Sequence, residues 1–316
     1  MTIAEGIPSH FYRQGWLFAL LATVIYSTNA PVARGAILAG MDPNTLVFGR
    51  FVLGNLLFAL TLGLTTMGQP RGTQRPFDRR AVAIGLGTGV INGLMLLAGA
   101  WGLTALSASI ATLLSIALTP LFIMGLLRLR GERIHSWDLL RLAIGLTGLY
   151  FLLGFDGTAN RWGILMTAVS AFLYALHMVL VQWFLRPYNT WTVTATLIFG
   201  ASLPAGILWW RMGASLYVPG AVGWLALLLQ GIAATYIARI LIYEAVNRIG
   251  SAQIALLTPL EAALTVLWSV LWLAEVITLG QSGGIALILV STALAARLPR
   301  ASWHRIRKLA TWPGRT

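Results

Sequence analysis

Cysteine is absent from the 316 residues, and charged residues make up only 10% of them. Without cysteine the chain forms no disulfide, no thiolate metal site and no cysteine nucleophile. A typical soluble domain is about 25% charged, whereas this chain is 58% hydrophobic with a mean hydropathy of +0.79. These values exclude a water-soluble fold.

Sequence patterns that support catalysis are also missing. The sequence contains no glycine-rich phosphate loop, no metal-ligand cluster and no serine and histidine pair at a usable spacing. ATP hydrolysis and intramembrane proteolysis therefore have no candidate site. We expect no enzyme activity, no catalytic residues, no metal site and no cofactor.

Long apolar runs fill most of the chain. A transmembrane helix takes about 20 apolar residues, because the hydrocarbon core is about 30 Å thick and each residue rises about 1.5 Å. Glycine, proline and charged residues separate these runs and predict spans at 14–34, 44–66, 81–101, 104–127, 139–155, 162–183, 190–211, 221–243, 251–273 and 277–296. The predicted fold class is therefore all-α integral membrane, with ten transmembrane helices.

The basic residues predict the orientation of these helices. Of the 22 Lys and Arg residues, 17 fall at the termini and in the loops of one side, three fall on the other, and Arg50 and Arg239 lie inside spans. Because basic loops stay in the cytoplasm, we expect a multi-pass inner (plasma) membrane protein with both termini cytoplasmic and a basic tail at 297–316. A charge spread over loops does not form a nucleic-acid surface, so the expected partners are the bilayer and a small-molecule substrate.

Two halves of the chain resemble each other. Ser107–Ala111 (SASIA) matches Ser251–Ala255 (SAQIA), and Glu132 and Glu275 follow at equivalent distances. The predicted domains are two five-helix repeats at 14–155 and 162–296. Because five is odd, the second repeat enters the membrane with opposite polarity, an arrangement that recurs in secondary transporters. Such a duplicated chain can work as a monomer, and the sequence leaves the oligomeric state open.

Several motifs carry a resemblance to a known family. They are Tyr26–Val32 (YSTNAPV), Arg50-Phe51, Ser107–Leu114 with Pro120 and Gly131-Glu132, and Thr258–Glu261 with Glu275. With them the chain resembles the drug/metabolite transporter superfamily, in its ten-helix form with two EamA-type repeats, and within it the YddG-type aromatic amino-acid exporters. The resemblance implies a central cavity lined by helices one, three, four, six, eight and nine.

The chain departs from that family at three places. It has Glu261-Ala262 where the family often has Glu-Pro, Ala274-Glu275 where it often has Gly-Glu, and Tyr174 where a Trp is usual. These departures bear on the subtype and on the site more than on the superfamily.

Polar and aromatic residues inside the spans are the candidates for the site, because an ionisable group at the bilayer centre costs about 2.5–3.5 kcal/mol. Glu261 could bind an ammonium or a proton, or partner an arginine, beside a helix bend expected at Pro259. Tyr174 and His177 share a helical face, as do Tyr26 and Asn29. The predicted substrate-binding residues are Tyr26, Asn29, Asn92, Trp101, Tyr174, His177, Tyr236 and Glu261.

Other intramembrane residues are assigned to the scaffold. Arg50 could meet a substrate carboxylate, but we expect it to act mainly within the bundle, and Pro31 is expected to break the first helix. The predicted structural or gating residues are Arg50, Pro31, Pro120 and Pro259.

These features predict a secondary transporter that exports small amphipathic metabolites by alternating access, most of all amino acids and preferably aromatic ones. Exporters of nucleosides, polyamines or hydrophobic drugs remain alternatives, as does a channel or scramblase without stoichiometric transport. Residues 14–34 contain no acid, which disfavours the mechanism of the small multidrug pumps, whose first helix binds cations through a Glu.

Overall fold

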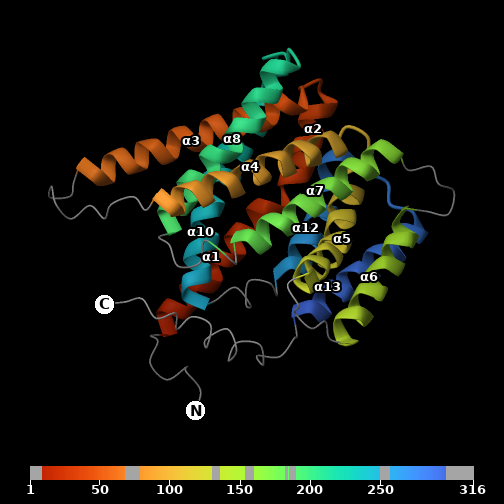
Figure 1. The fold of residues 1–316 in the computed structure, drawn as a ribbon. Coiled ribbons are helices and arrows are strands. Elements are labelled where there is room, and N and C mark those ends of the chain that lie inside the picture. Colours follow the sequence, from red (N-terminus) through yellow and green to blue (C-terminus); the bar gives the residue numbers. More distant parts are fainter. Residues whose placement is uncertain are drawn as a thin grey trace.

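The fold is a bundle of helices (Figure 1). The computed structural model describes residues 9–67, 79–129, 136–153, 160–181, 184, 190–249 and 257–296, and within these ranges it contains no strand. The helices are α1 (Ser9–Ser27), α2 (Asn29–Leu38), α3 (Pro43–Met67), α4 (Arg79–Gly102), α5 (Ala108–Leu129), α6 (Ser136–Leu153), α7 (Arg161–Leu180), α8 (Thr190–Arg211), α9 (Gly220–Leu228), the π-helix η2 (Leu229–Ile237), α10 (Ala238–Ile249), α12 (Thr258–Leu273) and α13 (Leu279–Ala296).

Ten hydrophobic helical segments stand at the predicted positions. Seven of them, from Arg13–Leu38 to Gly220–Ile242, are long and apolar enough to cross a membrane. Three shorter apolar helices, Leu142–Leu152, Pro259–Leu273 and Leu279–Ser291, occupy the predicted fifth, ninth and tenth spans. The predicted all-α membrane fold is confirmed.

The first span is broken, but ahead of its proline. The helix ends at Ser27, resumes at Asn29 and carries Pro31 inside the first turn of α2. Pro31 has no N–H to donate to the carbonyl four residues earlier, so the Ser27 carbonyl is released and accepts from Thr265 Oγ1 of α12 at 3.0 Å. The break lies at Thr28, beyond Tyr26 but ahead of Asn29 and Pro31, because a proline is tolerated in the first turn of the helix that follows the break.

The eighth span is wound differently in its middle. It runs through α9, the π-helix η2 and α10. Within η2 the Thr235 hydroxyl donates to the carbonyl of Gln230, five residues earlier, at 2.7 Å. Long π-helical stretches are rare and often mark functional sites, so this segment is a structural reason to look for the site here.

The described part of the ninth span is α12. Pro259 lies in its first turn, where the missing N–H costs no intrahelical bond. Residues 250–256 lie outside the described residues, so the helix bend expected beside Pro259 stays a prediction. The Ser251–Ala255 motif, Glu132 and the tail at 297–316 lie outside the described residues.

Small residues bring the central helices into close contact. A Cβ on Gly89 of α4 would lie 2.3 Å from the carbonyl oxygen of Leu197 in α8, and one on Gly200 would lie 2.4 Å from that of Leu86. Such contacts let membrane helices approach backbone to backbone. They lock α4 against α8, which come from opposite halves of the chain.

Candidate functional site

Arg50 is the charged residue around which the candidate site is built. It lies in α3, and only 7% of the residue is exposed. Its Nε donates to Thr235 Oγ1 at 3.1 Å, and its Nη1 donates to Gln230 Oε1 at 3.0 Å. Both acceptors belong to η2, so the π-helix holds the guanidinium.

Gln230 links this arginine to the break in the first span. Its Nε2 donates to the carbonyl oxygen of Asn29 at 3.2 Å while its Oε1 accepts from Arg50. One side chain thus connects the interrupted first span to the π-helical segment of the eighth. We call Asn29, Arg50, Gln230 and Thr235 the Arg50 cluster.

Aromatic residues and a second cation surround the Arg50 cluster. Tyr26 and Arg239 are close enough to Arg50 for electrostatic interaction. Tyr236, next to Thr235 in η2, packs edge-on against Phe58 with ring centroids 4.8 Å apart and hydrogen bonds with Thr61. The cluster therefore combines positive charge with aromatic surface.

His177 and Asn92 lie where α7 packs on α4. His177 is buried, and its Nδ1 is 3.1 Å from the carbonyl oxygen of Thr88. Asn92 stands one turn further along α4, and its Oδ1 is buried with no hydrogen-bond partner in the part of the chain that the structure describes. Arg239 is close enough for electrostatic interaction both to His177 and to Arg50. Tyr174, on the same helix as His177, is 41% exposed.

A third polar region joins α12 to the end of α1. Trp268 Nε1 donates to Ser27 Oγ at 3.0 Å, beside the bond from Thr265. Glu261 stands one turn before Thr265, whose hydroxyl also donates to the Glu261 carbonyl at 2.9 Å. Glu261 makes no ion pair with a described residue.

Trp101 and Pro120 make no hydrogen bond with the Arg50 cluster in the described residues. Trp101 ends α4, where its Nε1 donates to Asn44 Oδ1 at 3.2 Å. At the same end of the bundle, Glu275 accepts hydrogen bonds from the backbone N–H groups of Ala108 and Ser109 at 2.6 and 3.2 Å. Pro120 is inside α5. Among the described residues no three His, Asp or Glu side chains gather as a metal site.

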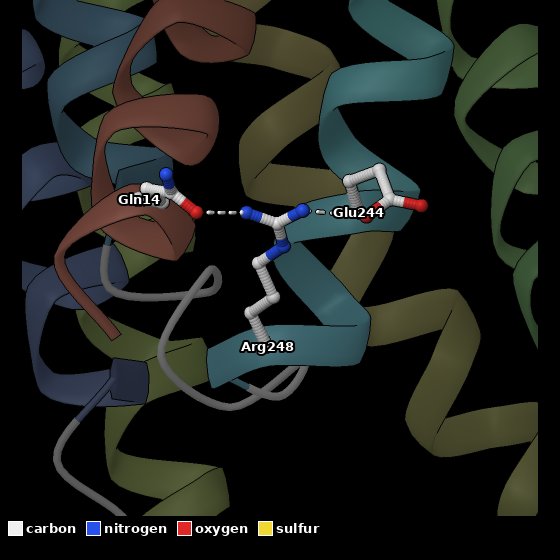
Figure 2. A network of polar contacts seen from close by, with 3 residues as sticks. All are labelled: Gln14, Glu244 and Arg248. Carbon is white, nitrogen blue, oxygen red and sulfur yellow. Dashed lines mark hydrogen bonds and ion pairs between the residues drawn. The ribbon is translucent and has the colours of Figure 1, made fainter. Parts of the chain in front are cut away.

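A separate network closes the opposite end of the bundle. Figure 2 shows Arg248 of α10 between Gln14 of α1, at 2.7 Å, and Glu244, at 3.2 Å. The Arg248 guanidinium also lies 4.6 Å from the ring centroid of Phe18. This network joins α1 to α10.

Sequence reasoning missed Gln230, Thr235 and Thr265. A signal for Gln230 was available, because it is a lone amide after the apolar run Leu227-Leu228-Leu229, and a polar group there needs a partner. Thr235 and Thr265 carry no such signal, since a threonine hydroxyl in a helix is ordinarily satisfied by its own backbone.

Comparison with known proteins identifies the family. The sequence profile of the EamA-like transporter family matches residues 13–154 and again residues 161–297. The chain belongs to the EamA-like transporter family. The family lies within the superfamily inferred from the motifs.

Two relatives of this EamA-like transporter extend the finding. An uncharacterized transporter of Archaeoglobus fulgidus is 26% identical over 288 residues, which is 90% of this chain and 97% of that protein. A protein of known crystal structure matches with a TM-score of 0.60 at 21% identity, covering 92% of this chain and 99% of that one. The first is similar as a transporter, and the second supports the fold alone.

The family assignment confirms the coarse functional prediction. The chain is a multi-pass membrane transporter and not an enzyme, and its substrate is a small molecule. The substrate class, the YddG-type subtype and the orientation of the termini are finer statements, which are proposed below.

Proposed function

We propose that this EamA-like transporter exports small amphipathic metabolites, and that amino acids, preferably aromatic ones, are its substrates. The observation that carries the proposal is the meeting of an interrupted helix and a π-helix at a buried, positively charged residue. Interrupted helices near the middle of the membrane form the substrate sites of many secondary transporters, because they expose backbone groups to the ligand. Here Gln230 joins the break at Thr28 to the π-helix beside Arg50.

Alternating access is the proposed mechanism, with the repeats at 14–155 and 162–296 rocking against each other. Its support is a packing pattern that is preserved when the halves are exchanged. The first span packs on the eighth as the sixth packs on the third, and the fourth packs on the sixth as the ninth packs on the first. An inverted duplication requires such paired contacts, and rocking of two similar halves exchanges the open side.

The proposed substrate region lies between the Arg50 cluster and the α4–α7 pair. Tyr26, Asn29 and Tyr236 contribute from one side, and Asn92, Tyr174 and His177 from the other. Glu261 borders the region from α12, and Trp101 forms a wall toward the Glu275 end. Pro31 and Pro120 shape the helices around it.

The proposed location is the inner (plasma) membrane, with both termini in the cytoplasm. Its support is the distribution of basic residues, 17 on one side against three on the other, because Lys and Arg are retained on the cytoplasmic side. The Glu275 end of the bundle then faces outward, and the Arg248 network faces the cytoplasm.

Efflux from loaded vesicles tests this function. Membrane vesicles containing the protein are loaded with labelled phenylalanine, tryptophan, uridine or spermidine, and the rate of loss is compared with vesicles lacking the protein. We expect accelerated loss of the aromatic amino acids. Accelerated loss of uridine or spermidine alone would replace the proposed substrate class by one of the alternatives.

A paired substitution tests the α7 face. Tyr174→Phe combined with His177→Gln removes the Tyr174 hydroxyl and replaces the His177 imidazole by an amide with little change of volume, so we expect slower amino-acid efflux with unchanged membrane expression. Efflux at the wild-type rate would remove this face from the site.

A further inference from the structure

The buried charge of Arg50 has no acidic partner in the described residues. No ion pair joins its guanidinium to a carboxylate there. Asp42 accepts from the first turn of α3, Glu275 accepts from the first turn of α5, and Glu244 pairs with the arginine one turn on. Holding a cation in the bundle without a counter-ion is costly, and Arg239 adds a second positive charge nearby.

Neutral side chains orient the guanidinium and leave one of its nitrogens unused. Thr235 and Gln230 accept from Nε and Nη1, whereas Nη2 makes no hydrogen bond within the described residues. Because Gln230 is itself bonded to the backbone of Asn29, the guanidinium plane is fixed from two elements. A fixed arginine edge is well suited to a carboxylate.

An unused acceptor lies in the same cluster. Oδ1 of Asn29 is buried and has no hydrogen-bond partner among the described residues, while the backbone oxygen of the same residue accepts from Gln230. Buried polar atoms in proteins are nearly always bonded, so an unbonded one calls for an explanation. A hydrogen-bond donor on a bound ligand would provide the missing partner of this oxygen.

We infer that the Arg50 cluster binds the α-amino-acid group of the substrate, with Arg50 Nη2 donating to the carboxylate and Asn29 Oδ1 accepting from the ammonium. The inference rests on the proposed function and refines it. The aromatic side chain of the substrate then lies toward Tyr26 and Tyr236. Gln230 is a positioning residue, since it holds both partners and binds no ligand itself.

This arrangement ranks ligands by the charge they carry. The carboxylate meets a full positive charge and the ammonium meets only a neutral oxygen. Removing the carboxylate should therefore weaken binding by roughly 100-fold, and removing the ammonium by about 10-fold. Three ligands with the same ring test the ranking: phenylalanine, 3-phenylpropionate, which lacks the ammonium, and phenethylamine, which lacks the carboxylate.

Binding to the purified full-length transporter is measured for each ligand by thermal stabilisation of its unfolding, which needs no transport. We expect the order phenylalanine, 3-phenylpropionate, phenethylamine. Arg50→Gln should weaken the binding of phenylalanine and of 3-phenylpropionate by roughly 100-fold. Arg50→Lys keeps the buried charge and should weaken their binding less. Arg248→Gln is the matched control, because it removes an arginine of the Figure 2 network, and it should leave the ranking unchanged.

Asn29→Ala separates the two halves of the inference. It should weaken the binding of phenylalanine by about 10-fold and leave the binding of 3-phenylpropionate unchanged, since only phenylalanine carries an ammonium group. Gln230→Ala should weaken both. Equal loss of both ligands in Asn29→Ala would overturn the ammonium assignment, and phenethylamine binding as tightly as 3-phenylpropionate would overturn the carboxylate assignment.

The same experiments distinguish this inference from the proposed function. If Arg50-dependent binding of phenylalanine occurs without any amino-acid efflux, the site stands and amino-acid export fails. If efflux of phenylalanine occurs in Arg50→Lys and Arg50→Gln at the wild-type rate and affinity, export stands and the inference fails.

Discussion

Substituting Gly89 by alanine should separate α4 from α8, and Gly87, two residues earlier, provides a matched control. The added Cβ at Gly89 would lie 2.3 Å from the Leu197 carbonyl oxygen and 2.9 Å from the Gly200 Cα, whereas at Gly87 it would meet nothing within 4 Å. To reach even 3.0 Å the α8 backbone must move by about 0.7 Å, and it cannot yield as a flexible side chain would.

The two substitutions should therefore change the free energy of unfolding in opposite directions. Alanine in place of glycine favours a helix by up to about 1 kcal/mol at either position, so Gly87→Ala should be neutral or slightly stabilising. Overpacking lowers the free energy of unfolding by about 1–3 kcal/mol. Gly89→Ala should lie at the upper end of this range, because its Cβ would meet backbone atoms. The difference between the variants, about 3 kcal/mol, isolates the packing of the two halves.

Thermal unfolding in detergent, followed by the fluorescence of the 13 Trp residues, measures this difference. Gly89→Ala should unfold at a lower temperature than Gly87→Ala and should also slow transport, since α4 and α8 belong to different halves. Equal stability of the two variants would refute the reasoning, because it would mean that α4 and α8 do not approach at Gly89.

Three further predictions concern other contacts. Glu275→Gln removes the negative charge at the first turn of α5 and should lower the free energy of unfolding by about 1–2 kcal/mol. Glu244→Gln, at a 40% exposed side chain, should lower it by at most about 1 kcal/mol. Equal losses in the same unfolding assay would contradict the α5 contact. Thr265→Val leaves the Ser27 carbonyl without its α12 donor and should cost about 1–3 kcal/mol, while Thr147→Val, which removes only an exposed bond within α6, should cost little. The chain has no cysteine, so single cysteines can be introduced to report the topology. In intact cells an impermeant maleimide should label Ala214→Cys but not Gln69→Cys. The reverse result would invert the proposed topology.

Much of the fold could be predicted from the sequence, because apolar runs of sufficient length have few alternatives in a bilayer. The ten segments and the doubling of the chain follow from run length and repeated motifs. The details of the breaks did not follow. A proline predicts a break in the first span, but the released Ser27 carbonyl and its partner Thr265 are 238 residues apart, and no local pattern joins them.

The candidate site was predictable in part for the same reason. Arg50, Asn29 and Tyr236 were singled out because polar or charged residues are rare inside spans, and the structure places them around one π-helix. Gln230 and Thr235 were missed because their role depends on the winding of η2, which Thr235 stabilises through the Gln230 carbonyl.

Counterflow of labelled phenylalanine into proteoliposomes that contain the purified protein tests the central claim most directly. With unlabelled phenylalanine or tryptophan inside, we predict uptake faster than into empty proteoliposomes, because a carrier with alternating access returns to the outer face sooner when it is loaded. Uptake that proceeds without any acceleration by internal amino acid would contradict alternating access and indicate a channel, and no uptake of any amino acid would contradict the proposed substrate class.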